Sequence, residues 1–301
     1  MTHNKSARLL ALLATALAPT AGIAPPLAHA TQTATLNVKL IPEQLGEGTT
    51  ILFDFNINTP DGQPPAPLTD MALLYPANIG LVTSGLGLAT CQPATLERLG
   101  PEGCPPDSLM GYGTALAEID FSSEPIQETG RITTWMGPLE NGHIQLLFNA
   151  EGQTPVNAQF IFTAVLSEAP APYGGALDTT IPIIPSAPEA PDVAVTQMRD
   201  TLGPKDITYI QTYHHKRIAY HPVGLRLPET CPHGGFPFAA TFTFLDGSHT
   251  QTTTTVPCPR TRRREPSQRR LRDTPVPSAA VTPDTSFASA RLKSEVAGSN
   301  R

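Results

Sequence analysis

The sequence predicts an all-β protein, an antiparallel β-sandwich of immunoglobulin-like or jelly-roll type built as one large sandwich or two coupled ones. Apolar and polar residues alternate in many short segments, which is the pattern of half-buried strands. Proline accounts for 33 of the 301 residues and charged residues for only 15%, so short elements joined by rigid turns are favoured over long helices. A third observation is a hairpin pattern over residues 227–259, around which the chain is organised.

Five apolar residues at every second position indicate the first strand of this hairpin, because an extended chain places them on one face. They are Phe236, Phe238, Ala240, Phe242 and Phe244. Asp246-Gly247 predicts a two-residue type I′ turn. The β-branched residues from Thr250 to Val256 predict the returning strand.

Four cysteines behind a secretory start predict two disulfides, for which three connectivities are possible. Pairing of nearest neighbours, Cys91 with Cys104 and Cys231 with Cys258, fits the two compact segments that contain them. In the predicted hairpin register Cys231 lies four residues, about 13 Å, beyond the position opposite Cys258. Either the glycines that follow Cys231 curl the chain back or the cysteines pair otherwise.

Further strands are predicted where apolar residues alternate or where β-branched and aromatic residues gather. Their ranges are 36–40, 51–57, 71–75, 112–121, 131–136, 144–150, 156–166, 193–198, 207–214 and 217–227. Between Cys91 and Cys104 one or two helical turns are expected, since Pro93 suits a first helical position and Gly100 a position just past the end. Residues 169–191 are rich in proline and are the best candidate for a boundary within the β region, with one short strand possible at 180–184.

The two ends of the chain differ from the middle. Residues 1–30 predict a secretory signal peptide, with a basic start, a short apolar run and an Ala28-His29-Ala30 cleavage site. Residues 31–259, the predicted β region, hold 8 Lys and Arg against 22 Asp and Glu, a net charge of −14. Residues 260–301 hold 10 basic and 4 acidic residues, a net charge of +6, and predict a disordered basic tail.

Two motifs carry a resemblance to a known group. The first is CPHGGFPF from Cys231, followed by an aromatic strand, DG, a Thr-rich strand and VPCP, and the second is CPPDSLMGYG from Cys104. Together they resemble a group of uncharacterised secreted proteins of high-GC Gram-positive bacteria. The resemblance implies a secreted β-rich domain and brings no activity or functional residues with it.

Three constellations of potentially catalytic or metal-binding side chains have an ordinary structural explanation. The histidines around His214, His215 and His221 fit a polar strand surface. Asp246, Ser248 and His249 lie in one tight turn, whereas a catalytic triad is assembled from distant segments. Glu118 and Asp120 alternate on one strand, which predicts a solvated acidic face rather than the two sides of a cleft. No catalytic residues are identified, and no cofactor, metal or nucleic-acid partner is expected.

These observations predict a secreted or extracellular, cell-wall-associated binding or structural protein without enzymatic activity. A secreted hydrolase acting on polysaccharide and a carbohydrate-binding module are the alternatives. No membrane span is expected, and the oligomeric state is left open. The predicted tail contains a cluster of seven arginines that could contact an anionic envelope polymer. They are Arg260, Arg262, Arg263, Arg264, Arg269, Arg270 and Arg272.

Overall fold

The structure is a computed structural model that describes residues 32–82, 89–121, 124–155, 157–186 and 192–259. The predicted signal peptide and basic tail lie outside these residues. The chain divides into two units, Met1–Arg260 and Thr261–Arg301, and the following description concerns the first. Within the described residues no helix is long and apolar enough to cross a membrane.

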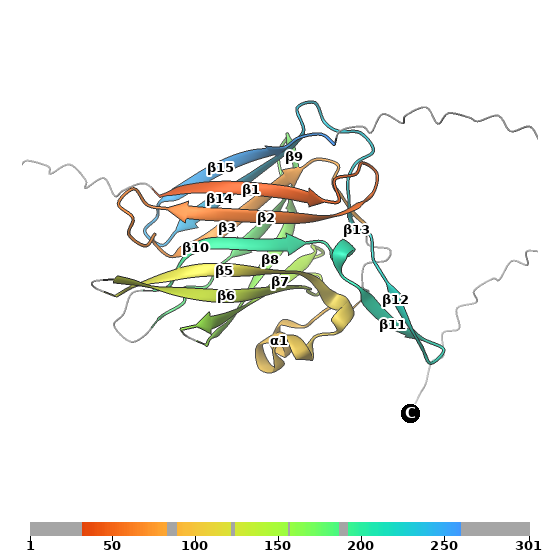
Figure 1. The fold of residues 1–301 in the computed structure, drawn as a ribbon, viewed down its shortest axis with the longest axis horizontal. Helices are drawn as coiled ribbons and strands as arrows, with labels where there is room; N and C mark the ends of the chain where they lie inside the picture. Colours follow the sequence, from red (N-terminus) through yellow and green to blue (C-terminus); the bar gives the residue numbers. More distant parts are fainter. Residues whose placement is uncertain (1–31, 83–88, 122–123, 156, 187–191, 260–301) are drawn as a thin grey trace, which may run out of the picture. The chain divides into compact units, whose positions relative to one another are not determined.

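Thirteen strands form one antiparallel sheet, which confirms the all-β prediction (Figure 1). Their order is β15-β14-β3-β9-β8-β7-β6-β5-β10-β2-β13-β4, and β1 pairs with β2. The bounds are β1 Thr33–Ile41, β2 Gly48–Asn58, β3 Leu68–Pro76, β4 Gly80–Val82, β5 Leu109–Phe121, β6 Glu124–Met136, β7 Gln145–Thr154, β8 Gln159–Glu168, β9 Tyr173–Thr180, β10 Ala194–Leu202, β13 Gly224–Arg226, β14 Phe236–Phe244 and β15 His249–Val256. Strands β5 to β9 follow each other in sequence and in the sheet, so they form a meander.

The sheet folds over itself, so that β1 lies beside β15 although the two are far apart in the order of pairing (Figure 1). Gln32 Nε2 donates a hydrogen bond to Ser248 Oγ (3.2 Å) at this junction. The inner faces of the two layers meet across the interior. For example, the rings of Phe55 on β2 and Phe242 on β14 have centroids 4.9 Å apart. The apolar core therefore lies between the layers, as the alternation of apolar residues predicted.

The closing hairpin has the predicted strands but a different turn. All five apolar residues of β14 that were predicted to share a face are buried. However, Phe236 pairs with Val256 and Thr243 with His249, so the loop contains three residues, Leu245 to Gly247, rather than two. Gly247 has a φ of 79°, as expected when a type I turn is followed by a left-handed residue.

Both disulfides have the predicted pairing. Cys231 and Cys258 have Cα atoms 5.8 Å apart, and the required curl occurs at Gly234 and Gly235, whose φ angles are 90° and 101°. Cys91 and Cys104 have Cα atoms 5.0 Å apart. Between the latter pair lie α1 (Pro93–Leu99) and the 3-10 helix η1 (Pro101–Gly103); two more 3-10 helices, η2 and η3, span Pro106–Ser108 and Pro204–Asp206. The helix begins at proline and ends at Gly100 as predicted.

Two further sequence predictions are wrong. Residues 169–191 contain the strand β9, which spans residues 173–180 rather than the predicted 180–184. Because β9 pairs with β3 along one edge and with β8 along the other, residues 173–180 are part of the sheet and not a linker. His214 does not continue a strand. With φ angles of 45° and 63°, His214 and His215 form the turn between β11 (Tyr209–Tyr213) and β12 (Lys216–Tyr220), a separate two-stranded sheet.

Candidate functional site

A row of polar side chains crosses the outer face of the sheet from β1 to β8, at one register position. Each residue pairs directly with the next across neighbouring strands, and all of them are exposed or half-exposed. The members of this polar row are Asn37, Asp54, Arg199, Thr114, Arg131, Glu151 and Gln159. Two carboxylates and two guanidinium groups balance, so the row is strongly polar without a net charge.

One end of the polar row is locked by side-chain contacts. Arg131 Nη2 lies 2.6 Å from Glu151 Oε2, and the side chains are 59% and 24% exposed. Partial burial alone would raise the pKa of Glu151, but hydrogen bonds from Arg131 and Asn149 outweigh it and hold this pKa below its usual value. Glu151 is therefore an anion paired with Arg131.

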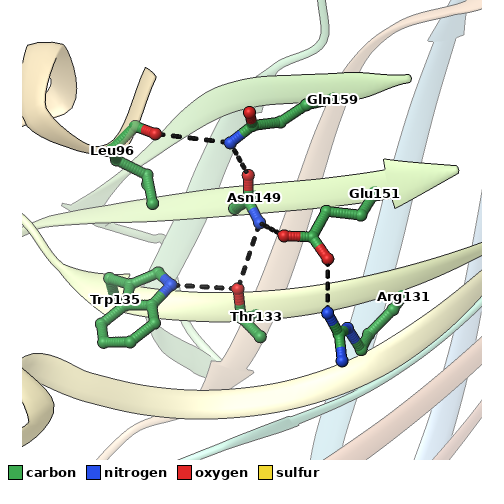
Figure 2. A network of polar contacts seen from close by, with 7 residues as sticks. All are labelled: Leu96, Arg131, Thr133, Trp135, Asn149, Glu151 and Gln159. Atoms are coloured by element: carbon green, nitrogen blue, oxygen red, sulfur yellow. Dashed lines mark hydrogen bonds and ion pairs between the residues drawn. The ribbon is translucent and has the colours of Figure 1, made fainter. Parts of the chain in front are cut away.

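The same contacts continue inward to the helix (Figure 2). The buried Asn149 donates from Nδ2 to Glu151 Oε1 (3.0 Å) and accepts from Gln159 Nε2 (2.6 Å), which also donates to the carbonyl of Leu96 in α1 (3.3 Å). Trp135 Nε1 donates to Thr133 Oγ1 (3.0 Å) beside them. Because the polar groups of this network are hydrogen-bonded to one another, the network attaches α1 to the outer face of the sheet and does not form a reactive centre.

That attachment also has an apolar part. Five residues form a second buried cluster, separate from the main core, where α1 meets β6 and β7. They are Cys91, Leu96, Cys104, Trp135 and Leu147. The disulfide-pinned segment is therefore a cover that shields one end of the outer face, and it leaves the opposite end open.

A polar hollow of about 270 Å³ lies near the other ends of β2, β5 and β10. Asn56 and Asn58 of β2, Thr196 and Gln197 of β10, and Glu118 of β5 line it, together with Thr59 and Gln63 of the loop after β2. We call this the polar hollow. Asn56 pairs with Gln197, and Gln197 with Leu116. The hollow therefore lies two residues along the strands from the polar row.

Local backbone features shape the polar hollow. The pairing of β10 with β5 shifts between Val195 and Gln197, and such a bulge re-aims the side chains at that point. After β2 the chain turns at Asp61-Gly62, where Gly62 has a φ of 73° and the Asp61 carboxylate accepts from the backbone N–H of Gln63 (3.2 Å). This turn forms one wall of the hollow.

The polar side chains of the hollow divide into bonded and available groups. Thr59 Oγ1 donates to the carbonyl of Gln63, and Thr196 Oγ1 donates to the carbonyl of Leu116 (3.2 Å). The side-chain amides of Asn56, Asn58 and Gln63 make no hydrogen bond with any residue that the structure describes. Gln197 Nε2 lies 3.4 Å from Asp54 Oδ1, and Gln127 Nε2 donates to Glu118 Oε1 (3.1 Å). The hollow thus presents donors and acceptors together, as needed to bind hydroxyl groups.

The residues considered from the sequence are not assembled into a catalytic or metal centre. Glu118 lies in the polar hollow, and the side chain of Asp120 lies outside the described part. The Asp246 carboxylate accepts from the backbone N–H of Ser248 (2.9 Å), which is turn chemistry as predicted. Within the described ranges no three His, Cys, Asp or Glu residues are grouped so as to hold a metal. The seven tail arginines lie beyond the described residues.

Sequence reasoning missed one buried ionisable group, Asp200 on β10. It is fully buried, Thr134 Oγ1 donates to its Oδ2 (2.9 Å), and its Oδ1 has no hydrogen-bond partner among the described residues. Burial raises its pKa to about 7, although hydrogen bonds from Thr134 and the backbone of Thr201 act in the opposite direction. The signal was present, because Asp200 alternates with Met198 and Leu202 on the apolar face of its strand.

Comparisons of the chain with protein-family models, curated proteins and solved structures gave no match.

Proposed function

We propose that this protein is a secreted binding protein of the cell envelope or extracellular space, and that its ligand is an uncharged, hydroxyl-rich polymer of carbohydrate type. The observation that carries the proposal is the polar hollow. It is lined by three amide side chains that have no hydrogen-bond partner among the described residues, together with two threonine hydroxyls and one carboxylate. Side-chain amides both donate and accept hydrogen bonds, and a carboxylate accepts them, which together matches the paired hydrogen bonds that sugar hydroxyls require.

The shape and charge of the outer face support a polymer as the ligand. The polar row lies two residues along the strands from the hollow, so a chain seated in the hollow can continue across neighbouring strands about 4.8 Å apart. Because the row has balanced charges, it favours neither a polyanion nor a polycation. The two disulfides are typical of proteins from oxidising compartments, which supports an extracellular location.

Binding without cleavage fits the hollow better than hydrolysis. Glycosidases place two carboxyl groups about 5–9 Å apart on either side of the scissile bond. The lining of the polar hollow contributes one carboxylate, Glu118, and its Oε1 already accepts a hydrogen bond from Gln127. The polysaccharide hydrolase therefore stays the second candidate.

Attachment to the envelope is proposed to involve the arginine cluster at residues 260–272, which holds seven positive charges in thirteen residues. The anionic polymers and phosphates of a bacterial surface would attract it. This electrostatic contact is screened beyond about 8–10 Å at physiological salt, and so differs from binding at the polar hollow, for which the proposed ligand is uncharged.

The experiment is a glycan array followed by calorimetry with cellohexaose, chitohexaose and mannohexaose. We expect at least one of these hexasaccharides to bind, and we expect Gln197→Ala to weaken that binding about tenfold by removing a hydrogen-bonding group from the hollow. The matched control is Gln251→Ala, an exposed glutamine on β15 that does not line the hollow. Equal loss in both variants, or cleavage of the hexasaccharide by the wild type, would contradict the proposal.

A further inference from the structure

The interior of the folded sheet contains an apolar pit of about 90 Å³ at one end. Its deep wall is formed by residues that are almost completely buried, among them Leu73 on β3, Leu177 on β9 and Phe238 on β14. A single water needs roughly 10–15 Å³ in the same measure, so the pit is several times larger than a packing defect. Its lining is aliphatic or aromatic apart from Gly203 and the hydroxyl group of Tyr75.

The pit opens to solvent through a rim of half-buried apolar side chains. Leu81, Met136, Leu166, Leu202 and Leu225 belong to this rim. They come from five strands, β4, β6, β8, β10 and β13, at the place where these strands begin or end. Apolar surface that stays in contact with water is unfavourable, so a ligand that covers the rim gains free energy from its burial.

The pit lies away from the polar hollow. Ile51 near the start of β2 lines the pit, whereas Asn58 at the end of β2 lines the hollow. Seven residues along a strand correspond to about 23 Å. In addition, the pit faces the interior between the layers, while the hollow lies on the outer face. A ligand of the pit is therefore independent of the function proposed above.

The dimensions and the lining of the pit restrict the class of ligand that it can bind. A protein partner needs a broad surface of about 800 Å² on each side, and the pit is a narrow hole that admits only the end of a chain. No charged side chain lines it, so nothing would compensate the desolvation of an ionic group. Flexible methionine side chains, here Met110 and Met136, adapt to chains of variable conformation.

We propose that this pit binds the end of an aliphatic chain, as carried by acyl- or alkyl-bearing amphiphiles, with the chain inside and the head group in solvent. Burial of one methylene contributes about 0.8 kcal/mol, which is about a fourfold change in Kd. The affinity should therefore rise about fourfold with each methylene until the pit is full, and then stay level. It should depend little on the charge of the head group.

The test follows the methionine methyl groups of the full-length protein by NMR, during titration with dodecanoate and with dodecyltrimethylammonium below their micelle concentrations. Both probes should shift the signals of Met110 and Met136, which line the pit, and leave those of Met71 and Met198 unchanged. Met71 and Met198 are buried core residues outside the pit lining. A shift of Met198 alone, or a response to only one of the two head groups, would overturn the proposal.

A pair of variants supplies the control. Leu166→Trp fills the pit from its rim and should reduce dodecanoate affinity at least tenfold. Val38→Trp introduces the same side chain at a half-buried position on β1 outside the pit lining, and should leave the affinity unchanged in folded protein. Chain lengths from hexanoate to tetradecanoate, measured by displacement of N-phenyl-1-naphthylamine, give the second readout. An affinity independent of chain length would overturn the proposal even if a variant failed to fold.

Discussion

The carboxyl group of Asp200 is placed where an apolar side chain would be expected. It pairs in register with Phe53 on one side and Gly113 on the other. A side chain on Gly113 would collide with it, since a Cβ built there would lie 2.6 Å from Asp200 Oδ1. The glycine therefore makes room for the carboxyl group, and the side chain of Thr134 donates a hydrogen bond to it.

Asp200 should make the stability depend on pH. Its pKa in the folded protein is raised to about 7 from 3.8, so folding favours the protonated form. The contribution of Asp200 to the free energy of unfolding should be greatest below about pH 4, fall as the pH rises to about 7, and stay level above it, with a total change on the order of 4 kcal/mol. Urea denaturation between pH 3 and 9 measures this.

The matched pair for that experiment is Asp200→Asn and Asp70→Asn. The first variant removes the buried ionisation, so most of the decline between pH 4 and 7 should disappear. The second changes an exposed aspartate on β3 and should leave the decline in place. An unchanged pH profile in Asp200→Asn would show that this group does not titrate as its burial implies.

Among the elements, β14 contributes most visibly to the core. Its aromatic residues are buried, and Phe242 contacts Phe55 of the opposite layer. Phe242→Ala should lower the free energy of unfolding by about 3–5 kcal/mol, because it leaves a cavity between the layers. The neighbouring Thr243→Ala, at an exposed position of the same strand, should cost less than about 1 kcal/mol. Chemical denaturation of the two variants measures both changes. Equal losses of unfolding free energy would contradict the burial of Phe242 in the core.

The disulfide-pinned segment that contains α1 can be tested through the fluorescence of the tryptophan beneath it. Trp135 is the sole tryptophan and is 6% exposed beneath the Cys91–Cys104 segment. Replacement of both cysteines by serine should lower the free energy of unfolding by about 2–4 kcal/mol. It should also shift the tryptophan emission to longer wavelength as the cover loosens. A stability loss without any change in emission would mean that α1 stays attached through the Gln159 and Asn149 contacts alone.

At the scale of the whole molecule, the sequence revealed most strands because their alternation is local. It could not reveal β9, since Tyr173-Gly174-Gly175-Ala176 has the composition of a loop. Gly175 is required there because the Tyr75 ring lies against it, and a Cβ would meet the Tyr75 hydroxyl at 2.1 Å. That requirement comes from a strand about a hundred residues away. The predicted register of the closing hairpin was wrong by one residue, because Leu245 belongs to the loop and not to the strand.

The candidate site was hidden from sequence reasoning for a related reason. Asn56, Glu118 and Gln197 stand in three segments that are far apart in the chain, and only the order β2-β10-β5 brings them together. Asn56 was identifiable as an outward residue of an alternating strand. Nothing local indicated its neighbours or the bulge at Thr196, because strand order depends on long-range pairing.

The arginine cluster gives a whole-molecule prediction. Wild-type protein should bind isolated Gram-positive cell walls at low salt and be released at about 0.5–1 M salt, where the screening length falls to a few ångströms. Replacement of all seven arginines by glutamine in the full chain should abolish this salt-sensitive binding. Replacement of Arg291, Lys293 and Arg301, which lie outside the cluster, should not. Salt-sensitive binding of equal strength in both variants would rule out the cluster as the contact.

The central claim is that the polar hollow binds a hydroxyl-rich polymer, and the side-chain amide signals of the ¹⁵N-labelled protein test it most directly. On titration with the hexasaccharide that binds in calorimetry, the NH₂ signals of Asn56, Asn58, Gln63 and Gln197 should shift together and saturate with one Kd. Those of Asn141 and Gln251, which are exposed outside the hollow, should stay in place. Shifts that gather at Asn141, Gln251 or elsewhere, with the four hollow amides unmoved, would contradict the account.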